Sequence, residues 1–255
     1  MIKPYIKYLM KARDEHAIHS PFIFETYTKA IREKTAYPVY KQVEQRRKQL
    51  LTVEKEIEVE DFGAGSKIHH TNKRKVKNIA KYSAEKAPIG QLLYRLVTYF
   101  KPAVMLDLGT SLGITSSYMA LGNPTGTFYT FEGAKQIAEI AEETFQQQGV
   151  EAQLILGNID ETLPSVVETL QQVDFVFFDA NHRYQPTLNY FNICLSKAHE
   201  GSIFVFDDIY WSREMENAWK SIKEHKEVML TIDLFSVGLV FFRKKQPKQH
   251  FILKL

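Results

Sequence analysis

At 255 residues the chain is long enough to bury a large hydrophobic core, as one domain or as one domain with an extension. Hydrophobic residues at 44% and charged residues at 25% are typical of a globular protein, and a formal charge of +3 gives no reason to expect nucleic-acid binding by the protein as a whole. No apolar run reaches the roughly 18 residues of a membrane span, and the charged first residues do not resemble a signal peptide. We therefore expect a soluble cytoplasmic protein with no membrane partner. The single cysteine, Cys194, lies in a helical apolar pattern that predicts a buried thiol.

The chain changes character near residue 85, which predicts a boundary between residues 1–85 and 86–255. Apolar residues spaced three and four apart predict mostly helix over residues 1–56, whereas residues 57–84 are polar and are expected to be irregular. We expect the first part to be a helical extension, or lid, that covers the active-site edge.

From residue 86 onward, short apolar runs alternate with amphipathic helical stretches, a pattern typical of parallel strands joined by crossover helices. The runs predict strands at 104–109, 127–132, 152–157, 174–179 and 202–207. Helices are expected at 88–100, 113–121, 134–148, 161–171, 186–199 and 212–225. Two last strands, 228–235 and 237–244, are separated only at Ser236, so they must be antiparallel. The prediction is an α/β fold: a doubly wound, Rossmann-like, mostly parallel sheet of seven strands with an antiparallel C-terminal hairpin and an N-terminal helical extension.

A glycine turn follows the first of these strands. Asp107 precedes Gly109, and the next helix begins near Gly113, so the backbone can approach a ligand closely and offer helix N–H groups to it. Alone this pattern also fits a tight turn with no ligand. Glu132 ends the second strand about 25 residues after Asp107, where an acid can hold the two hydroxyls of a ribose. Asn158 follows Gly157 at the end of the third strand, where its amide can recognise an adenine edge.

Three carboxylates end the fourth and fifth strands, at Asp179, Asp207 and Asp208. Neighbouring strand ends converge, and clustered carboxylates repel one another unless a cation neutralises them. Oxygen ligands favour Mg²⁺ or Ca²⁺, so the pattern predicts a divalent-metal site, although Asp208 can instead cap the following turn. His182, three residues after Asp179, is a candidate general base toward a substrate hydroxyl, or a loop histidine that only bonds its surroundings. Four residues beside these positions are expected to line an aromatic pocket or its rim: Arg183, Tyr184, Tyr210 and Trp211.

Taken together, these segments resemble class I S-adenosylmethionine-dependent methyltransferases, most closely the catechol-type and related bacterial O-methyltransferases. The matching segments are PIGQLLYRLV, LDLGTSLGITSSYMA, TFEG, GNIDETLP, DFVFFDANHRY and FVFDDIYW, within residues 86–244. The resemblance implies S-adenosylmethionine as cofactor, with these binding residues: Asp107, Gly109, Thr110, Ser111, Gly113, Glu132, Gly157, Asn158, Ile159 and Asp179. It also implies metal ligation by Asp179, Asp207 and Asp208, catalysis by His182 and Asp179, and O-methylation of a small acceptor such as an aromatic hydroxyl.

The sequence departs from the catechol enzymes at three of these positions. His182 stands where they carry a lysine, Asn158 replaces an aspartate of the adenine motif, and Asp207-Asp208 replaces an Asp-Asn pair. These changes concern the substrate class and the metal more than they concern cofactor binding.

Three other classes of protein share parts of the pattern. Gly109 to Gly113 also satisfies G-x-S-x-G, the nucleophile turn of serine hydrolases, with Ser111 as nucleophile, Asp179 or Asp207 as acid and His225 as base. The basic segment 67–81 suggests an RNA-directed methyltransferase or an RNA-binding protein. A nicotinamide-dependent oxidoreductase is disfavoured, because the turn lacks the G-x-G-x-x-G spacing. The segment DFGAGS (61–66) is expected to be a loop. The sequence leaves the acceptor and the oligomeric state open.

Overall fold

The computed structural model describes residues 2–59 and 73–255. The chain forms two compact units. One is Lys34–Ser165, here called the glycine-turn unit, and the other combines Met1–Glu33 with Val166–Leu255 and is here called the C-terminal unit. The segment DFGAGS and residues 67–72 of the basic segment lie outside the described residues.

The glycine-turn unit contains three parallel strands in the order β3-β4-β5, with helices packed around them. Its elements are α3 (Pro38–Leu50), β1 (Glu56–Glu58), β2 (Lys73–Lys75), α4 (Val76–Tyr82), α5 (Ala87–Phe100), β3 (Val104–Leu108), α6 (Ile114–Gly122), β4 (Thr127–Glu132), α7 (Lys135–Gln148) and β5 (Gln153–Leu156). α8 (Ile159–Thr169) follows and leads into the C-terminal unit. Each expected strand and helix of this part is confirmed to within about two residues, the usual uncertainty of helix ends.

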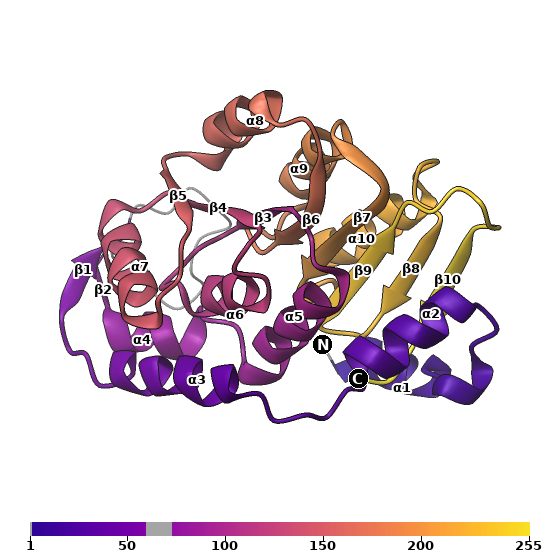
Figure 1. Cartoon of the computed structure of the whole chain (residues 1–255), viewed down its shortest axis with the longest axis horizontal. Coiled ribbons are helices and arrows are strands. Elements are labelled where there is room, and N and C mark those ends of the chain that lie inside the picture. Colours follow the sequence, from indigo (N-terminus) through magenta and orange to yellow (C-terminus); the bar gives the residue numbers. More distant parts are fainter. Residues whose placement is uncertain (1, 60–72) are drawn as a thin grey trace. The chain divides into compact units, whose positions relative to one another are not determined.

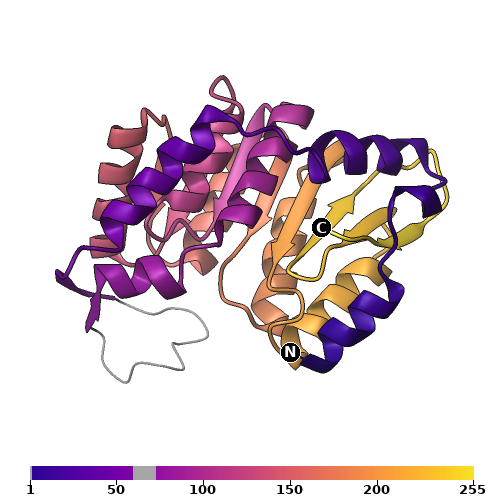
Figure 2. The ribbon, with the colours of Figure 1, turned by 90° about the horizontal axis from the view of Figure 1, so that it is seen from below.

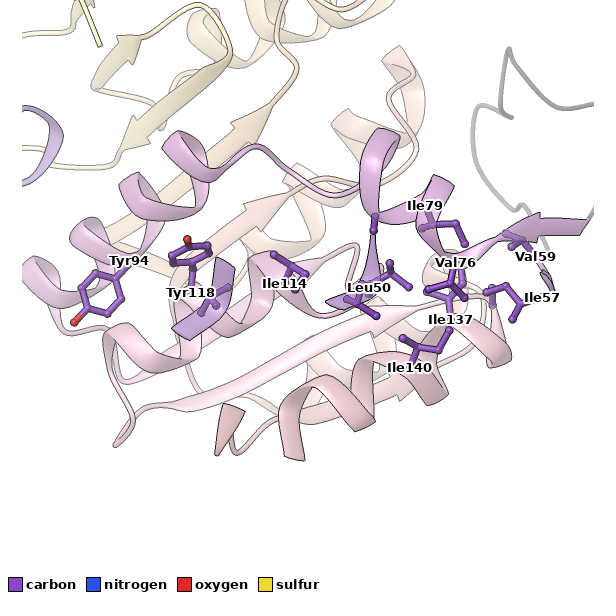
Figure 3. Packing of buried hydrophobic residues seen from close by; sticks show 14 residues of the cluster. Leu50, Ile57, Val59, Val76, Ile79, Tyr94, Ile114, Tyr118, Ile137 and Ile140 are labelled. Atoms are coloured by element: carbon purple, nitrogen blue, oxygen red, sulfur yellow. The ribbon is translucent and has the colours of Figure 1, made fainter. Parts of the chain in front are cut away.

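The N-terminal part of the glycine-turn unit packs onto its helices. α3 contacts α4, α5, α6 and α7, and Figures 1 and 2 show it running across them. Figure 3 shows the cluster that results, in which Leu50 of α3 and Ile79 of α4 lie among buried residues such as Ile114 and Ile137. Leu50 is fully buried, so replacing it by alanine would cost about 2–5 kcal/mol of stability.

Residues 57–84 were expected to be irregular, and for the described residues of this stretch that prediction is wrong. β1 and β2 pair as antiparallel strands, and α4 follows β2 directly. The segment VKNIAKY buries Val76, Ile79 and Ala80, which stand three and four residues apart on one helix face. Lysines and other polar residues surround this short apolar face, so the composition of the segment did not indicate a helix.

The C-terminal unit contains five strands in the order β10-β8-β9-β7-β6. Its elements are α1 (Ile2–Lys11), a 3₁₀ helix (Glu15–Ala17), α2 (Pro21–Thr26), a π-helix (Tyr27–Ile31), β6 (Val173–Phe178), α9 (Tyr184–Leu195), β7 (Ala198–Asp207), α10 (Arg213–Glu224), β8 (Leu230–Asp233), β9 (Val237–Phe241) and β10 (Gln249–Ile252). β6 and β7 are parallel, whereas β9 is antiparallel to both β7 and β8. The expected C-terminal hairpin is therefore confirmed, and Phe235 in its turn has a φ of +70°.

Counted together, the units hold eight strands of a mostly parallel sheet, which confirms the doubly wound α/β fold. The expected number of seven strands was one too few, because β10 adds a parallel strand beside β8 (Figure 1). Gln249 and Leu253 donate their N–H groups to Met229 and Asp233 at the two ends of this pairing. β10 is short and half polar, so its sequence carries little strand signal; the exposed edge of β8 supplies the partner. No helix among the described residues has the length and apolar character to cross a membrane.

Candidate cofactor and metal sites

The glycine turn between β3 and α6 contains three residues with positive φ, a conformation that residues with a side chain rarely adopt. Gly109 has a φ of +128°, Ser111 of +48° and Gly113 of +77°. A Cβ atom at Gly113 would lie 2.9 Å from the ring of Phe145 and 3.2 Å from the carbonyl oxygen of Ala141. Glycine at position 113 is therefore required both by the left-handed backbone and by the close approach of α7.

Asp107 lies beneath this turn and is fully buried. Its Oδ2 accepts hydrogen bonds from the Ser116 hydroxyl at 2.5 Å and from the Thr130 hydroxyl at 2.9 Å. The hydroxyl of Thr130 also lies 2.6 Å from that of Thr110. These contacts tie the turn to the start of α6 and to β4, so the structure gives Asp107 and Thr110 a supporting position.

Glu132 at the end of β4 reaches back to the turn. Its Oε2 accepts the backbone N–H of Ser111 at 2.9 Å, and its Oε1 accepts that of Ala134 at the same distance. Burial raises the pKa of Glu132 above its ordinary value, and the backbone N–H groups of Ala134, Ser111 and Gly133 oppose the rise. Each oxygen of the carboxylate can still accept a further hydrogen bond.

The residue that follows β5 also contacts Glu132. Gly157, with a φ of +134°, donates its N–H to the carbonyl oxygen of Glu132 at 3.0 Å. The Oδ1 of Asn158 accepts the N–H of Asp160 at 3.1 Å, so Asn158 caps α8, which starts at Ile159. The structure thus brings together, within one unit, the three places where cofactor-binding residues were expected: 109–113, 132 and 157–159.

In the C-terminal unit, Asp179, His182 and Asp207 form a cluster. One ligand-type atom from each lies within 4.8 Å of those of the other two. Nε2 of His182 is 3.4 Å from Oδ1 of Asp179, and Asp207 is almost fully buried. Asp208 does not belong to this group; it has a φ of +51°, and its carbonyl oxygen accepts the N–H of Trp211 at 2.8 Å. The structure thus brings together two of the three expected metal ligands and adds His182.

Tyr184 and Tyr210, expected near a pocket, are both engaged in the protein. The Tyr184 hydroxyl lies 3.1 Å from that of Ser221, and the Tyr210 hydroxyl donates to Oδ2 of Asp233 at 2.6 Å. Burial and the negative charge of Asp233 raise the pKa of Tyr210 well above its ordinary value. Arg183 and Trp211 are exposed, as rim residues would be.

Asp233 is a buried carboxylate that sequence reasoning overlooked. It accepts hydrogen bonds from Tyr210, from the indole N–H of Trp219 at 3.3 Å and from the N–H of Phe235 at 3.0 Å. A signal was present, because an aspartate in the apolar run VMLTIDLF must find partners when the strand is buried. Its bond to Tyr210 fixes the loop that follows Asp207.

The residues of the serine-hydrolase interpretation show no nucleophile–base pairing. The Oγ of Ser111 is buried and makes no hydrogen bond in the structure. In the other unit, Nδ1 of His225 accepts the N–H of Glu227 at 3.3 Å, and the imidazole packs on Phe191. Among the described residues, Ser111 Oγ thus shows no hydrogen bond to a base of the kind that nucleophilic catalysis by serine uses.

Part of the basic segment is neutralised locally. The Nζ atoms of Lys75 and Lys77 both bond to the carboxylate of Glu54, and the bond from Lys75 is 3.1 Å long. Lys81 lies over the ring of Tyr82. This pattern within the described residues gives the RNA-binding interpretation no support.

Comparison with known proteins points to one family. A family described as a methyltransferase domain matches residues 106–209. A probable O-methyltransferase of Mycobacterium tuberculosis is 30% identical over 156 residues, which is 54% of this chain and 66% of that protein. The chain thus spans less than two thirds of the length of this relative, and it spans 43% of a transmembrane O-methyltransferase homolog of Rattus norvegicus, to which it is 33% identical over 110 residues.

Solved structures share the fold. A putative O-methyltransferase from Klebsiella pneumoniae has a TM-score of 0.59 at 19% identity, covering 82% of this chain and 91% of its own. The O-methyltransferase TomG of Streptomyces achromogenes, solved in complex with S-adenosylmethionine, has a TM-score of 0.55 at 21% identity, covering 62% and 81%. Residues 106–209 therefore match a methyltransferase domain, and the chain is similar in sequence and in fold to O-methyltransferases.

Proposed function

We propose that this protein transfers the methyl group of S-adenosylmethionine to an oxygen of a small acceptor, assisted by a divalent cation. The observation that carries the proposal is the hydrogen bond between the Ser111 N–H and the Glu132 carboxylate, which joins the glycine turn to the carboxylate at the next strand end. A glycine turn beside a carboxylate at the next strand end is a typical binding site for a dinucleotide or an adenosyl group.

The residues of the glycine-turn unit fit an adenosyl cofactor. The buried Oγ of Ser111 makes no hydrogen bond, so a ligand at the turn would supply its partner. The backbone of Gly109 to Gly113 would hold the methionine part, and the free lone pairs of Glu132 would accept the two ribose hydroxyls. Because Oδ1 of Asn158 is engaged as a cap, its Nδ2 would donate to the adenine, with Gly157 and Ile159 beside it.

The cluster of Asp179, His182 and Asp207 fits a divalent cation, since its atoms are two carboxylate oxygens and an imidazole nitrogen at close range. A cation held there would supply positive charge that lowers the pKa of an acceptor hydroxyl and fixes its oxygen. The imidazole ligand extends the choice of ion from Mg²⁺ toward Mn²⁺, Co²⁺ and related metals.

His182 has a second use if Asp208 completes the ligand set in its place. Its Nε2 would then accept the proton of the acceptor hydroxyl while Oδ1 of Asp179, 3.4 Å away, orients the imidazole. The hydroxyl oxygen would attack the methyl carbon, the carbon–sulfur bond would break with its electron pair moving to sulfur, and the proton would remain on His182. In the first alternative the metal needs His182 as a ligand, and in the second it needs Asp208.

The test is transfer of a labelled methyl group from S-adenosylmethionine to a panel of acceptors headed by catechol-type phenols. We expect product with a vicinal dihydroxy aromatic, a loss of at least about tenfold with EDTA, and recovery with Mg²⁺ or Mn²⁺. Asp207→Asn should behave like the EDTA-treated protein, whereas Glu200→Gln, a change of an exposed acid in β7, should not. Activity that survives both EDTA and Asp207→Asn unchanged would remove the metal from the proposal.

A further inference from the structure

Helix α1 exposes most of its apolar side chains. The exposed fractions are 46% for Tyr5, 52% for Ile6, 50% for Leu9 and 78% for Met10. Among the side chains described for this helix, Tyr8 alone is buried. Single exposed apolar residues are ordinary on protein surfaces, but four neighbours on one ten-residue helix form a continuous patch, and such patches mark binding surfaces.

The patch has a cationic border. At about 100° per residue, Tyr5, Ile6, Leu9 and Met10 fall on one arc of the helix, and the exposed Lys7 and Lys11 lie beyond Met10 on its far flank. The segment Ile2–Lys11 contains no acidic residue. A wide apolar arc with lysines along its border and no acid is the pattern of a helix that lies in a membrane interface.

The attachment of α1 uses Tyr8 and one edge of Tyr5, whose ring lies 4.8 Å from that of Phe235, and it leaves Ile6, Leu9 and Met10 exposed. The hydroxyl of Tyr8 donates to the carbonyl oxygen of Leu253 at 2.5 Å, and its ring lies 5.4 Å from that of Phe235. Burial raises the pKa of Tyr8 to about 12, so this hydroxyl stays protonated as a donor at neutral pH. These contacts hold α1 as a formed helix in the C-terminal unit. Binding to a surface therefore does not require the loss of conformational entropy that folding the helix there would involve.

We propose that α1 docks this protein on the surface of an anionic membrane, with Ile6, Leu9 and Met10 entering the acyl boundary and Lys7 and Lys11 facing lipid phosphates. With ten residues the helix is about 15 Å long, about half of a hydrocarbon core, so it lies along the surface. A second copy is a poorer occupant, because two such helices in contact would bring lysines of like charge together. The sequence-based expectation of no membrane partner rested on the lack of a long apolar segment, which an interfacial helix does not need.

The experiment is co-sedimentation of the full chain with vesicles of phosphatidylcholine alone and of phosphatidylcholine with about one third phosphatidylglycerol. We expect binding to the anionic vesicles at least about tenfold tighter than to the neutral ones, weakening as salt is added. Ile6→Ser with Leu9→Ser should weaken binding to both vesicles by about tenfold or more. Lys7→Glu with Lys11→Glu should abolish the preference for anionic lipid.

Leu51→Ser and Leu156→Ser are the matched controls, since they remove exposed leucines of the glycine-turn unit, and they should leave binding unchanged. Circular dichroism and melting curves identify any variant that fails to fold. If the Ile6 and Leu9 variant does not fold, the Lys7 and Lys11 variant, which changes only exposed side chains, still tests the proposal. The proposal is overturned if the wild-type chain does not bind anionic vesicles, or if the α1 variants bind as it does. A dimer in solution that Leu9→Ser dissociates, without vesicle binding, would identify a second copy as the occupant.

Discussion

The backbone N–H of Ser111 donates to Oε2 of Glu132 at 2.9 Å, so the glycine turn and the acid at the next strand end form one structural unit. Glu132 is held there although burial raises its pKa, which means that the folded protein bears a cost for keeping this carboxylate ionised. A buried charge kept at a cost is characteristic of a ligand-binding position.

We predict that Glu132→Gln weakens cofactor binding in a chain that still folds. Loss of charge-assisted bonds to the ribose should weaken binding of S-adenosylhomocysteine by about 10- to 100-fold. Both carboxylate oxygens accept backbone N–H groups and glutamine keeps only one acceptor oxygen, so the variant should also melt at a somewhat lower temperature while remaining folded at the titration temperature. Titration calorimetry and melting curves check both effects, with Glu139→Gln, an exposed acid of α7, as control. A variant that loses affinity only because it unfolds would contradict this.

Gly113→Ala should destabilise the protein more than Gly149→Ala does. Both glycines have positive φ, +77° and +66°, so both substitutions carry the left-handed penalty of about 1 kcal/mol. Only Gly113 also faces a ring atom of Phe145 at 2.9 Å, whereas a Cβ atom at Gly149 would meet nothing within 4 Å. We expect an additional loss of about 1–3 kcal/mol at Gly113 in urea unfolding. Equal losses at the two positions would show that the close approach does not matter.

The metal ligand set can be resolved by Mn²⁺ binding, followed by electron paramagnetic resonance. If the cluster in the structure is the ligand set, Asp179→Asn, Asp207→Asn and His182→Gln should each weaken Mn²⁺ binding by about tenfold or more, and Asp208→Asn should not. The opposite ranking of His182 and Asp208 would assign the metal to three aspartates and leave His182 as the base.

Tyr210→Phe should destabilise the C-terminal unit by about 1–3 kcal/mol, because it removes the strongest donor from the buried Asp233. A double-mutant cycle with Asp233→Asn isolates the coupling between the two side chains. Tyr82→Phe, which alters an exposed tyrosine, is the control. Additive effects in the cycle would mean that the 2.6 Å contact contributes nothing.

Stability should fall as the pH is lowered from 7 to 5, in part through two histidines. Burial lowers the pKa of His250, with Lys223 and Lys248 adding to it, and burial likewise lowers that of His225. A folded-state pKa below the unfolded value of 6.5 means that the unfolded chain takes up more protons, so the stability these groups contribute is complete above that pH and is lost below it. His250→Asn with His225→Asn should melt with a shallower dependence on pH in this range; an unchanged slope would refute it.

The sequence predicted the parallel strands and crossover helices because their apolar runs are long and periodic. β10 was missed, since its pairing with β8 depends on an exposed edge and not on its own side chains. The grouping of the candidate cofactor residues at 109–113, 132 and 157–159 was predictable, because the strand ends of a parallel sheet share an edge. The place of His182 beside Asp207 was not predictable, because it depends on the loop after β6, where Asn181 takes a φ of +52°. The partners of Asp233 required the tertiary structure for the same reason.

The most direct test of the central claim is calorimetric titration of the full chain with S-adenosylhomocysteine, beside NADH and with Glu132→Gln as the matched variant. The account predicts binding of S-adenosylhomocysteine at one site per chain, weakened by about 10- to 100-fold in Glu132→Gln, and no binding of NADH. Binding of NADH without S-adenosylhomocysteine, or an affinity for S-adenosylhomocysteine that Glu132→Gln leaves unchanged, would contradict it.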